Sequence, residues 1–187
     1  MQDHLVALRA DYERQAGRSL ALPIAGAVVW TIVGIAALFL PQRTANLVLL
    51  FGSGTMFPLA MLLSQPLGES LIGNTNPLAK LMGMSVLMVN LLWAVHFTVV
   101  FLDPQYLPLT LGIGLGLHWI VFSWVIGHPI GTIHAILRTG LVTLFWWLFP
   151  ESRLTMVSLG VVIAYATSIF VLATRKRGIR QPEVEPA

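Results

Sequence analysis

The sequence predicts an all-α integral membrane protein, a bundle of six transmembrane helices preceded by an amphipathic interfacial helix. Of the 187 residues, 56% are hydrophobic and only 10% are charged, whereas a soluble domain has about 25% charged residues. The apolar residues form runs of about 20, the length that an α-helix needs to cross a bilayer. Membrane β-strands are about 10 residues long and alternate in polarity. Composition and run length therefore exclude a soluble globule and a barrel.

Residues 20–174 form the predicted membrane domain. Short polar turns at residues 41–43 and 103–105 make the spans on either side of them antiparallel neighbours. Pro58 lies inside the second run, where its missing N–H predicts a kink or an early helix end. The six predicted spans are residues 20–40, 44–64, 78–102, 107–126, 129–149 and 154–174.

The segments outside the spans are more polar. Residues 1–19 place Leu5, Leu8, Tyr12 and Ala16 at helical spacing, which predicts an amphipathic helix at the cytoplasmic membrane interface. Residues 175–187 begin with a basic cluster and continue as a tail whose composition predicts disorder. The connection at residues 65–77 is either a plain loop or a re-entrant element, because non-helical backbone at membrane depth has to be buried in protein.

The basic residues set the predicted orientation. Eight Lys and Arg residues fall on the side of the two termini, against two, Arg43 and Arg153, on the opposite side. Because positive residues favour the cytoplasmic side, both termini of this multi-pass protein are expected in the cytoplasm. The basic residues thus report orientation and do not indicate a nucleic-acid partner. Besides the bilayer itself, anionic lipid headgroups are the expected partner of the basic termini.

Arg138 is the one charged residue deep inside a predicted span. At about 1.5 Å per residue it lies about 13 Å beyond Pro129, near mid-bilayer, where an arginine costs on the order of 2.5–3.5 kcal/mol and needs partners. His134 lies one turn earlier on the same helix face, and His118 reaches a similar depth on the preceding span. The candidate ligand-binding site, which would open inward, comprises Arg138, His118, His134, Asn90, Ser123 and Glu69.

These residue types favour an anionic ligand, since the guanidinium group is a planar donor fork for carboxylate or phosphate. The predicted function is therefore to bind or transport a small anionic solute. The alternative is a structural or assembly protein whose polar cluster only fixes helix packing, with Arg138 capping loop carbonyls or pairing with Glu69. An intramembrane enzyme comes third, because the sequence has no nucleophile motif in the required context, and no catalytic residue is predicted.

No metal ion or other cofactor is predicted. The chain contains no cysteine and no HExxH motif. A cluster of His118, His128 and His134 is the weak alternative for a metal site, and the charge of Arg138 nearby would repel a cation.

Five short motifs carry a resemblance to a known family: Phe57-Pro58-Leu59, Asn76-Pro77-Leu78, Tyr106-Leu107-Pro108-Leu109, Leu117-His118-Trp119 and Ser123-Trp124. Together they resemble an uncharacterised family of small polytopic bacterial membrane proteins. The resemblance implies a bacterial inner membrane as the location. That family has no assigned activity, so no functional residue is transferred. Because a chain of this size makes a thin bundle, a homodimer is the oligomer we consider.

Overall fold

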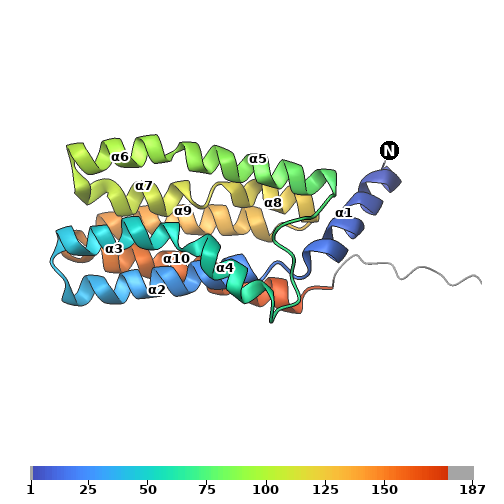
Figure 1. Cartoon of the computed structure of the whole chain (residues 1–187). Helices are drawn as coiled ribbons and strands as arrows, with labels where there is room; N and C mark the ends of the chain where they lie inside the picture. The colour runs from blue at the N-terminus through green and yellow to red at the C-terminus, as the bar shows by residue number, and fades with distance from the viewer. Residues whose placement is uncertain (1, 177–187) are drawn as a thin grey trace, which may run out of the picture.

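The apolar runs of the sequence become helical rods that lie side by side and alternate in direction (Figure 1). The computed structural model describes residues 2–176, so most of the predicted disordered tail lies outside the described residues. A first helix, α1 (Gln2–Ala16), lies across one end of the bundle. The rods are α2 (Ala21–Phe39), α3 (Gln42–Gly54) with α4 (Met56–Ser64), α5 (Pro77–Leu91) with α6 (Trp93–Leu102), α7 (Leu107–Gly114) with α8 (His118–Ile126), α9 (Ile130–Leu148) and α10 (Arg153–Thr174).

Several of these rods are long and apolar enough to cross a membrane. Four meet this test on their own: α2, α5 with α6, α7 with α8, and α10, the last two including the short 3-10 turns that precede them (Pro104–Tyr106 and Pro150–Ser152). The bent pair of α3 and α4 makes a fifth if it counts as one span. Helix α9 is not among them, and it contains Arg138 and His134, which lower its mean hydropathy. Within residues 2–176 the structure is thus all-helical, with four or five candidate spans whose length and composition suit a membrane, and it does not confirm six.

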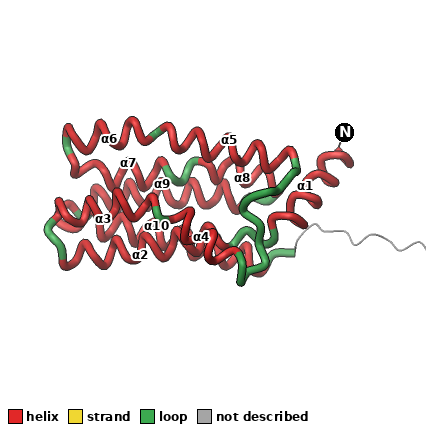
Figure 2. Tube along the Cα trace, viewed as in Figure 1, coloured by secondary structure: helices red, strands yellow, loops and turns green. Residues whose placement is uncertain are grey.

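The rods are broken at three places. Helices α3 and α4 meet at Thr55 with a bend of 44°. Pro58 has no N–H to donate to the carbonyl of Gly54, so the helix breaks in the turn before the proline, as predicted. The breaks at Leu92 and at residues 115–117 follow no proline and were not predicted (Figure 2).

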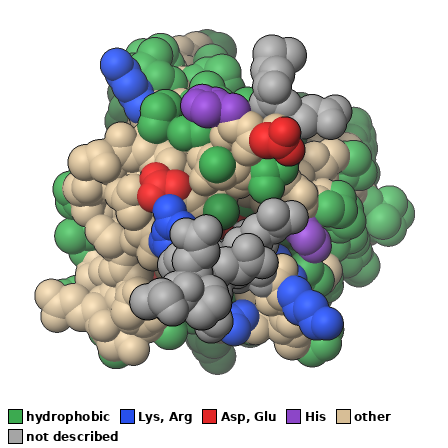
Figure 3. All heavy atoms as spheres, turned by 90° about the vertical axis from the view of Figure 1, so that its right-hand side faces the viewer, with side chains coloured by type: hydrophobic (Ala, Val, Ile, Leu, Met, Phe, Trp, Pro, Cys, Tyr) green, Lys and Arg blue, Asp and Glu red, His purple; other side chains and the backbone are tan. Residues whose placement is uncertain are grey.

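The two ends of the bundle differ in charge. We call the end with α1, the 65–76 connection and the last turn of α10 the α1 end, and the opposite end the far end (Figure 1). Charged and histidine side chains gather on the α1 end, while apolar side chains cover the flanks (Figure 3). Among the described residues, the basic side chains of the far end are Arg43 and Arg153, and those of the α1 end are Arg9, Arg14, Arg18, Lys80, Arg175 and Lys176.

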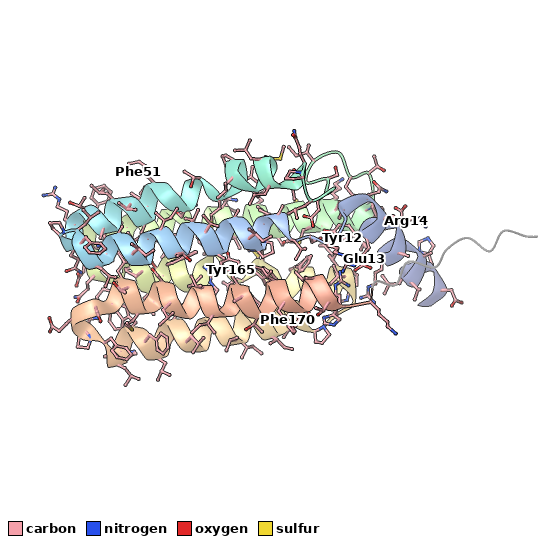
Figure 4. The ribbon with its side chains drawn as sticks, turned by 90° about the horizontal axis from the view of Figure 1, so that it is seen from below. Tyr12, Glu13, Arg14, Phe51, Tyr165 and Phe170 are labelled. Atoms are coloured by element: carbon pink, nitrogen blue, oxygen red, sulfur yellow. The ribbon has the colours of Figure 1, made fainter. Side chains whose placement is uncertain are left out.

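The interior of the bundle is built mainly where α10 packs along α2 and α9. Trp30, Val142 and Val157 are fully buried there, whereas Phe51 and Phe170 are 71% and 69% exposed. Figure 4 shows Phe51 at the outer edge of the bundle and Tyr165 between α2 and α10. Large apolar side chains on the outside are what a lipid environment accepts, so the polar groups that remain inside require an explanation.

Candidate functional site

Arg138 on α9 lies at the centre of the bundle and is 0% exposed. Its Nε donates to the carbonyl oxygen of Gly112 at 2.5 Å, and its Nη1 donates to the hydroxyl of Tyr165 at 3.0 Å. Its guanidinium carbon lies 5.5 Å and 5.2 Å from the ring centres of Trp30 and Tyr165, within the range of cation–π attraction. The third nitrogen, Nη2, is equally buried and has no acceptor among the described residues.

The carbonyl of Gly112 is free for Arg138 because α7 ends close by. In a continuous α-helix this oxygen would accept from the N–H of Gly116, four residues later. Here the N–H of Gly116 donates instead to the carbonyl oxygen of Ile113, at 2.9 Å. The break at residues 115–117 therefore creates the acceptor that the arginine uses.

Glycines also give Arg138 and Tyr165 their space. A Cβ on Gly116 would lie 2.8 Å from Cδ of Arg138, and a Cβ on Gly26 would lie 2.4 Å from the ring of Tyr165. Both distances are shorter than a carbon–carbon contact of about 3.5 Å. Side chains at these two positions would displace the arginine and its tyrosine partner.

No acidic side chain balances the charge of Arg138 within residues 2–176. The ion pairs found there join Arg14 to Asp11 and Arg175 to Glu13, both at the α1 end. A buried charge is costly unless it is paired, and here two neutral acceptors and two aromatic faces stand in for a carboxylate. Arg138 is thus a buried cation with one donor group still unused.

His134 lies one turn from Arg138 and is 1% exposed. Its ring stacks on Trp119, with ring centres 3.9 Å apart. The hydroxyl of Ser168 donates to the carbonyl of Ala164 at 2.9 Å, so its oxygen is left to accept from Nδ1 of His134 at 2.8 Å. In a neutral ring Nε2 then carries a lone pair, and it has no partner among the described residues.

A cavity of about 260 Å³ runs from beneath α1 to His118 and Trp119 on α8. The buried Nδ1 of His118 has no partner within the described part of the chain. Arg138 does not line this cavity. Its side chain lies against Gly116, two residues before His118, so the polar cluster is close to the inner end of the cavity without opening into it.

Helix α1 closes the cavity at the α1 end of the bundle. Tyr12 and Ala16 of α1 line the cavity and are each 7% exposed. Burial of the Tyr12 hydroxyl, followed by the charge of the neighbouring Glu13, raises the pKa of Tyr12 to about 12. Figure 4 shows Tyr12 and Glu13 where α1 meets the bundle. The buried side chains of Glu13 and Arg175 form an ion pair at 2.5 Å.

Further contacts hold α1 in place. Arg9 and Arg18 donate at 2.6 Å to the carbonyls of Trp124 and Ala173, close to the last turns of α8 and α10. The 65–76 connection adds Asn76, which donates to Asp11 at 2.7 Å, and this hydrogen bond, with Arg14 second, lowers the pKa of Asp11. The predicted amphipathic helix is therefore fixed to the bundle by many polar contacts.

Three of the six predicted site residues lie near one another: His134 is one turn from Arg138 and stacks on Trp119, and the ring centre of His118 is 6.2 Å from that of Trp119. Glu69 does not pair with Arg138. The pairing that the structural alternative predicted for these two residues is therefore wrong. Its carboxylate accepts from the N–H groups of Leu20 and Ala21 at 2.7 Å and 2.9 Å. Leu20 cannot cap α2 itself, so a distant carboxylate caps the helix and complements its dipole.

The other two predicted residues lie elsewhere. Asn90 is exposed and donates to Val86 of its own helix at 2.9 Å. Ser123 donates to the carbonyl of His128 at 2.6 Å and helps to shape the turn between α8 and α9. Nowhere in residues 2–176 do three His, Asp or Glu side chains gather as metal ligands, so His118, His128 and His134 do not form the cluster considered as an alternative.

Three partners of Arg138 were not predicted as site residues: Gly112, Tyr165 and Trp30. A signal existed for Tyr165, since a hydroxyl in the middle of an apolar run has to find a partner. No comparable signal marks Gly112, because its role depends on a backbone carbonyl that only the broken helix exposes.

Comparison with known proteins adds a family but no activity. The model of a family of unknown function, DUF7010, matches residues 5–175 of the chain. No curated protein and no solved structure matches it.

Proposed function

The chain belongs to the DUF7010 family of unknown function, and from its own site we propose that it is a membrane protein that binds or transports a small anion at Arg138. The observation that supports this proposal most strongly is the unused donor Nη2 of a fully buried arginine that has no acidic partner within residues 2–176. An anionic oxygen would satisfy that donor and balance the charge.

The route to the arginine would pass through the cavity. His118 stands at the inner end of the cavity with an unpartnered Nδ1, and Gly116, two residues before it, contacts the side chain of Arg138. For an anion to reach Arg138, the side chain of His118 or Trp119, which line the cavity, would have to rotate aside. In this proposal His118 is the first polar contact of the anion and Arg138 is the second.

We also propose six spans, both termini in the cytoplasm and the bacterial inner membrane as the location. Helix α9 has the same length as α2, 19 residues, and it packs against α7, α8 and α10 inside the bundle. The excess of basic side chains at the α1 end supports the orientation.

A structural role is the second candidate. Arg138 already has two hydrogen bonds and two aromatic neighbours, and it is closed off from the cavity. In that case the arginine joins α9 to the broken turn of α7 and to α10, and binds no ligand.

Binding measurements separate the two candidates. The purified protein in lipid nanodiscs is titrated with radiolabelled acetate and decanoate, and binding to empty nanodiscs is subtracted. If the arginine binds the anion, Arg138→Gln lowers the affinity at least tenfold, since a hydrogen bond to a charged group contributes about 1.5–3 kcal/mol.

Arg153→Gln is the matched control, because Arg153 also lies over an aromatic ring, that of Trp146, but at the far end. It should leave the affinity unchanged. If neither carboxylate binds in a saturable way, or Arg138→Gln binds like the wild type, the anion function is wrong and the structural role stands.

A further inference from the structure

The walls of the cavity are mostly apolar. Pro23 of α2, Phe57 of α4, Met82 and Val86 of α5, and Phe122 of α8 line it together with the polar side chains of Ser70 and Asn74 near the α1 end. A small hydrated anion gains nothing from such walls. They match the hydrocarbon part of a ligand.

The open side of the cavity faces the flank of the bundle. At the α1 end the cavity is covered by Tyr12 and Ala16, which are buried where α1 packs on the bundle. On the flank, Phe57 of α4 is 49% exposed and Val86 of α5 is 39% exposed. Gly83, which also lines the cavity from α5, is exposed, and a Cβ built on it would meet no atom within 4 Å. The cavity can therefore be entered between α4 and α5, from the hydrocarbon layer.

The arrangement of helices explains this opening. Helix α4 packs on α2 and α3, whereas α5 packs on α8, α6 and α1. In Figure 1, α5 lies above α8 and α4 lies below it. Helix α4 is bent by 44° from α3 at Thr55 and does not pack along α5, and residues of α8 line the cavity between them.

The inner end of the cavity has the opposite character. His118 presents a polar ring there, and the uncompensated charge of Arg138 lies against Gly116, two residues before it. Helix α8, nine residues from His118 to Ile126, extends over about 12 Å, so an extended hydrocarbon chain fits between the polar end and the cover formed by α1.

From these features we propose that the ligand is an anionic amphiphile that enters from the bilayer, a medium-chain carboxylate. Its hydrocarbon chain fills the cavity between α4 and α5, and its carboxylate lies at His118 and Arg138. The position of the headgroup rests on the proposed function, whereas the position of the chain rests on the walls and on the opening.

The test compares decanoate with acetate and with the neutral decanol, again with radiolabelled ligands in nanodiscs after subtraction of empty discs. Gly83→Trp should block the opening and lower the affinity for decanoate at least tenfold. Gly140→Trp is the matched control, since Gly140 on α9 is also exposed with no atom within 4 Å of a built Cβ, but it does not line the cavity. Val86→Trp is a second blocking variant, and gel filtration with circular dichroism checks that each variant folds.

The outcomes distinguish this inference from the proposed function. Support requires that decanoate binds at least tenfold more tightly than acetate and decanol, and that both blocking variants and Arg138→Gln weaken it. If acetate binds as tightly as decanoate and depends on Arg138 but not on Gly83, the anion function stands and the amphiphile is wrong. If decanol binds as tightly as decanoate, and if the blocking variants lower the affinity but Arg138→Gln does not, the proposed carboxylate headgroup is wrong. The proposed anion function is then wrong as well.

Discussion

Arg138 and Gly112 depend on each other across two helices. The Nε of Arg138 on α9 donates to the carbonyl oxygen of Gly112 on α7 at 2.5 Å, and that oxygen is free only because the next turn follows a 3-10 pattern. The break in the rod would leave a buried carbonyl without a donor if Arg138 were absent. The arginine would lack an acceptor if the helix continued unbroken.

Gly116→Ala should destabilise the protein by about 1–3 kcal/mol, the usual cost of overpacking a core. The added Cβ would lie 2.8 Å from Cδ of Arg138 and push the guanidinium away from Gly112. Gly140→Ala on α9 is the control. It has open space and should gain about 0.5–1 kcal/mol from helix propensity. Unfolding in detergent measures both, and equal stability of the two variants would contradict the close contact.

Tyr165→Phe should cost about 1 kcal/mol, because it removes the acceptor of Nη1 and leaves a second buried donor of Arg138 unpaired. Tyr106→Phe provides the comparison, since the ring of Tyr106 stacks on Trp146 near the far end. That change should have almost no effect on thermal stability. A loss of the same size at both positions would show that the hydroxyl of Tyr165 has no special role.

Glu13→Gln should release α1 from the bundle. Breaking a buried ion pair leaves a charge uncompensated and typically costs 3–5 kcal/mol. Since the chain has no cysteine, a single Ala16→Cys reports the release. Its reaction with a water-soluble maleimide should accelerate at least tenfold in the Glu13→Gln background.

Glu151→Gln, an exposed change at the far end, serves as the control for that labelling experiment. It should leave the rate of reaction at position 16 unchanged. If Glu13→Gln also left it unchanged, the ion pair with Arg175 would not be what holds α1.

Stability should fall on acidification through His128. Its Nδ1 accepts from the N–H of Ile130 at 3.2 Å, which only a neutral ring can do, and burial, followed by the charge of Arg175, lowers its pKa from 6.5. Below pH 6.5 the unfolded chain binds the proton first, so stability decreases until the folded histidine is also protonated.

His128→Asn keeps a side-chain acceptor without a titrating group. It should therefore flatten the fall of the melting temperature between pH 7 and pH 5. An identical pH profile for the variant and the wild type would rule out His128 as the cause.

Much of the fold could be predicted because apolar run length is a strong signal. Each predicted span contains a helix or helix pair in the structure, and Pro58 marks a bend for a reason that is visible in the sequence. The breaks at Leu92 and at residues 115–117 could not be predicted, since Leu and Gly occur in unbroken membrane helices too. The number of six spans stays a prediction, because α9 carries Arg138 and His134 and is not apolar enough to count as a span by composition.

The candidate site was predictable only where a charge stands out. Arg138 is conspicuous in an apolar run, and its two histidines follow from helix geometry. Glu69 was misplaced because a loop carboxylate can reach either the arginine or the start of α2, and only the folded chain decides between them. The docking of α1 and of Arg18 just after it depends on contacts with residues as distant as Ala173 and Arg175, which no local pattern indicates.

The attachment of α1 has a consequence for biogenesis. Helix α1 is synthesised long before α10, yet Glu13 pairs with Arg175, and Arg18, just after α1, donates to Ala173, 155 residues further along the chain. The contacts of α1 with Trp124 and Asn76 can form earlier in synthesis. The cover over the cavity is therefore held by its full set of contacts only once the last turn of α10 has been made.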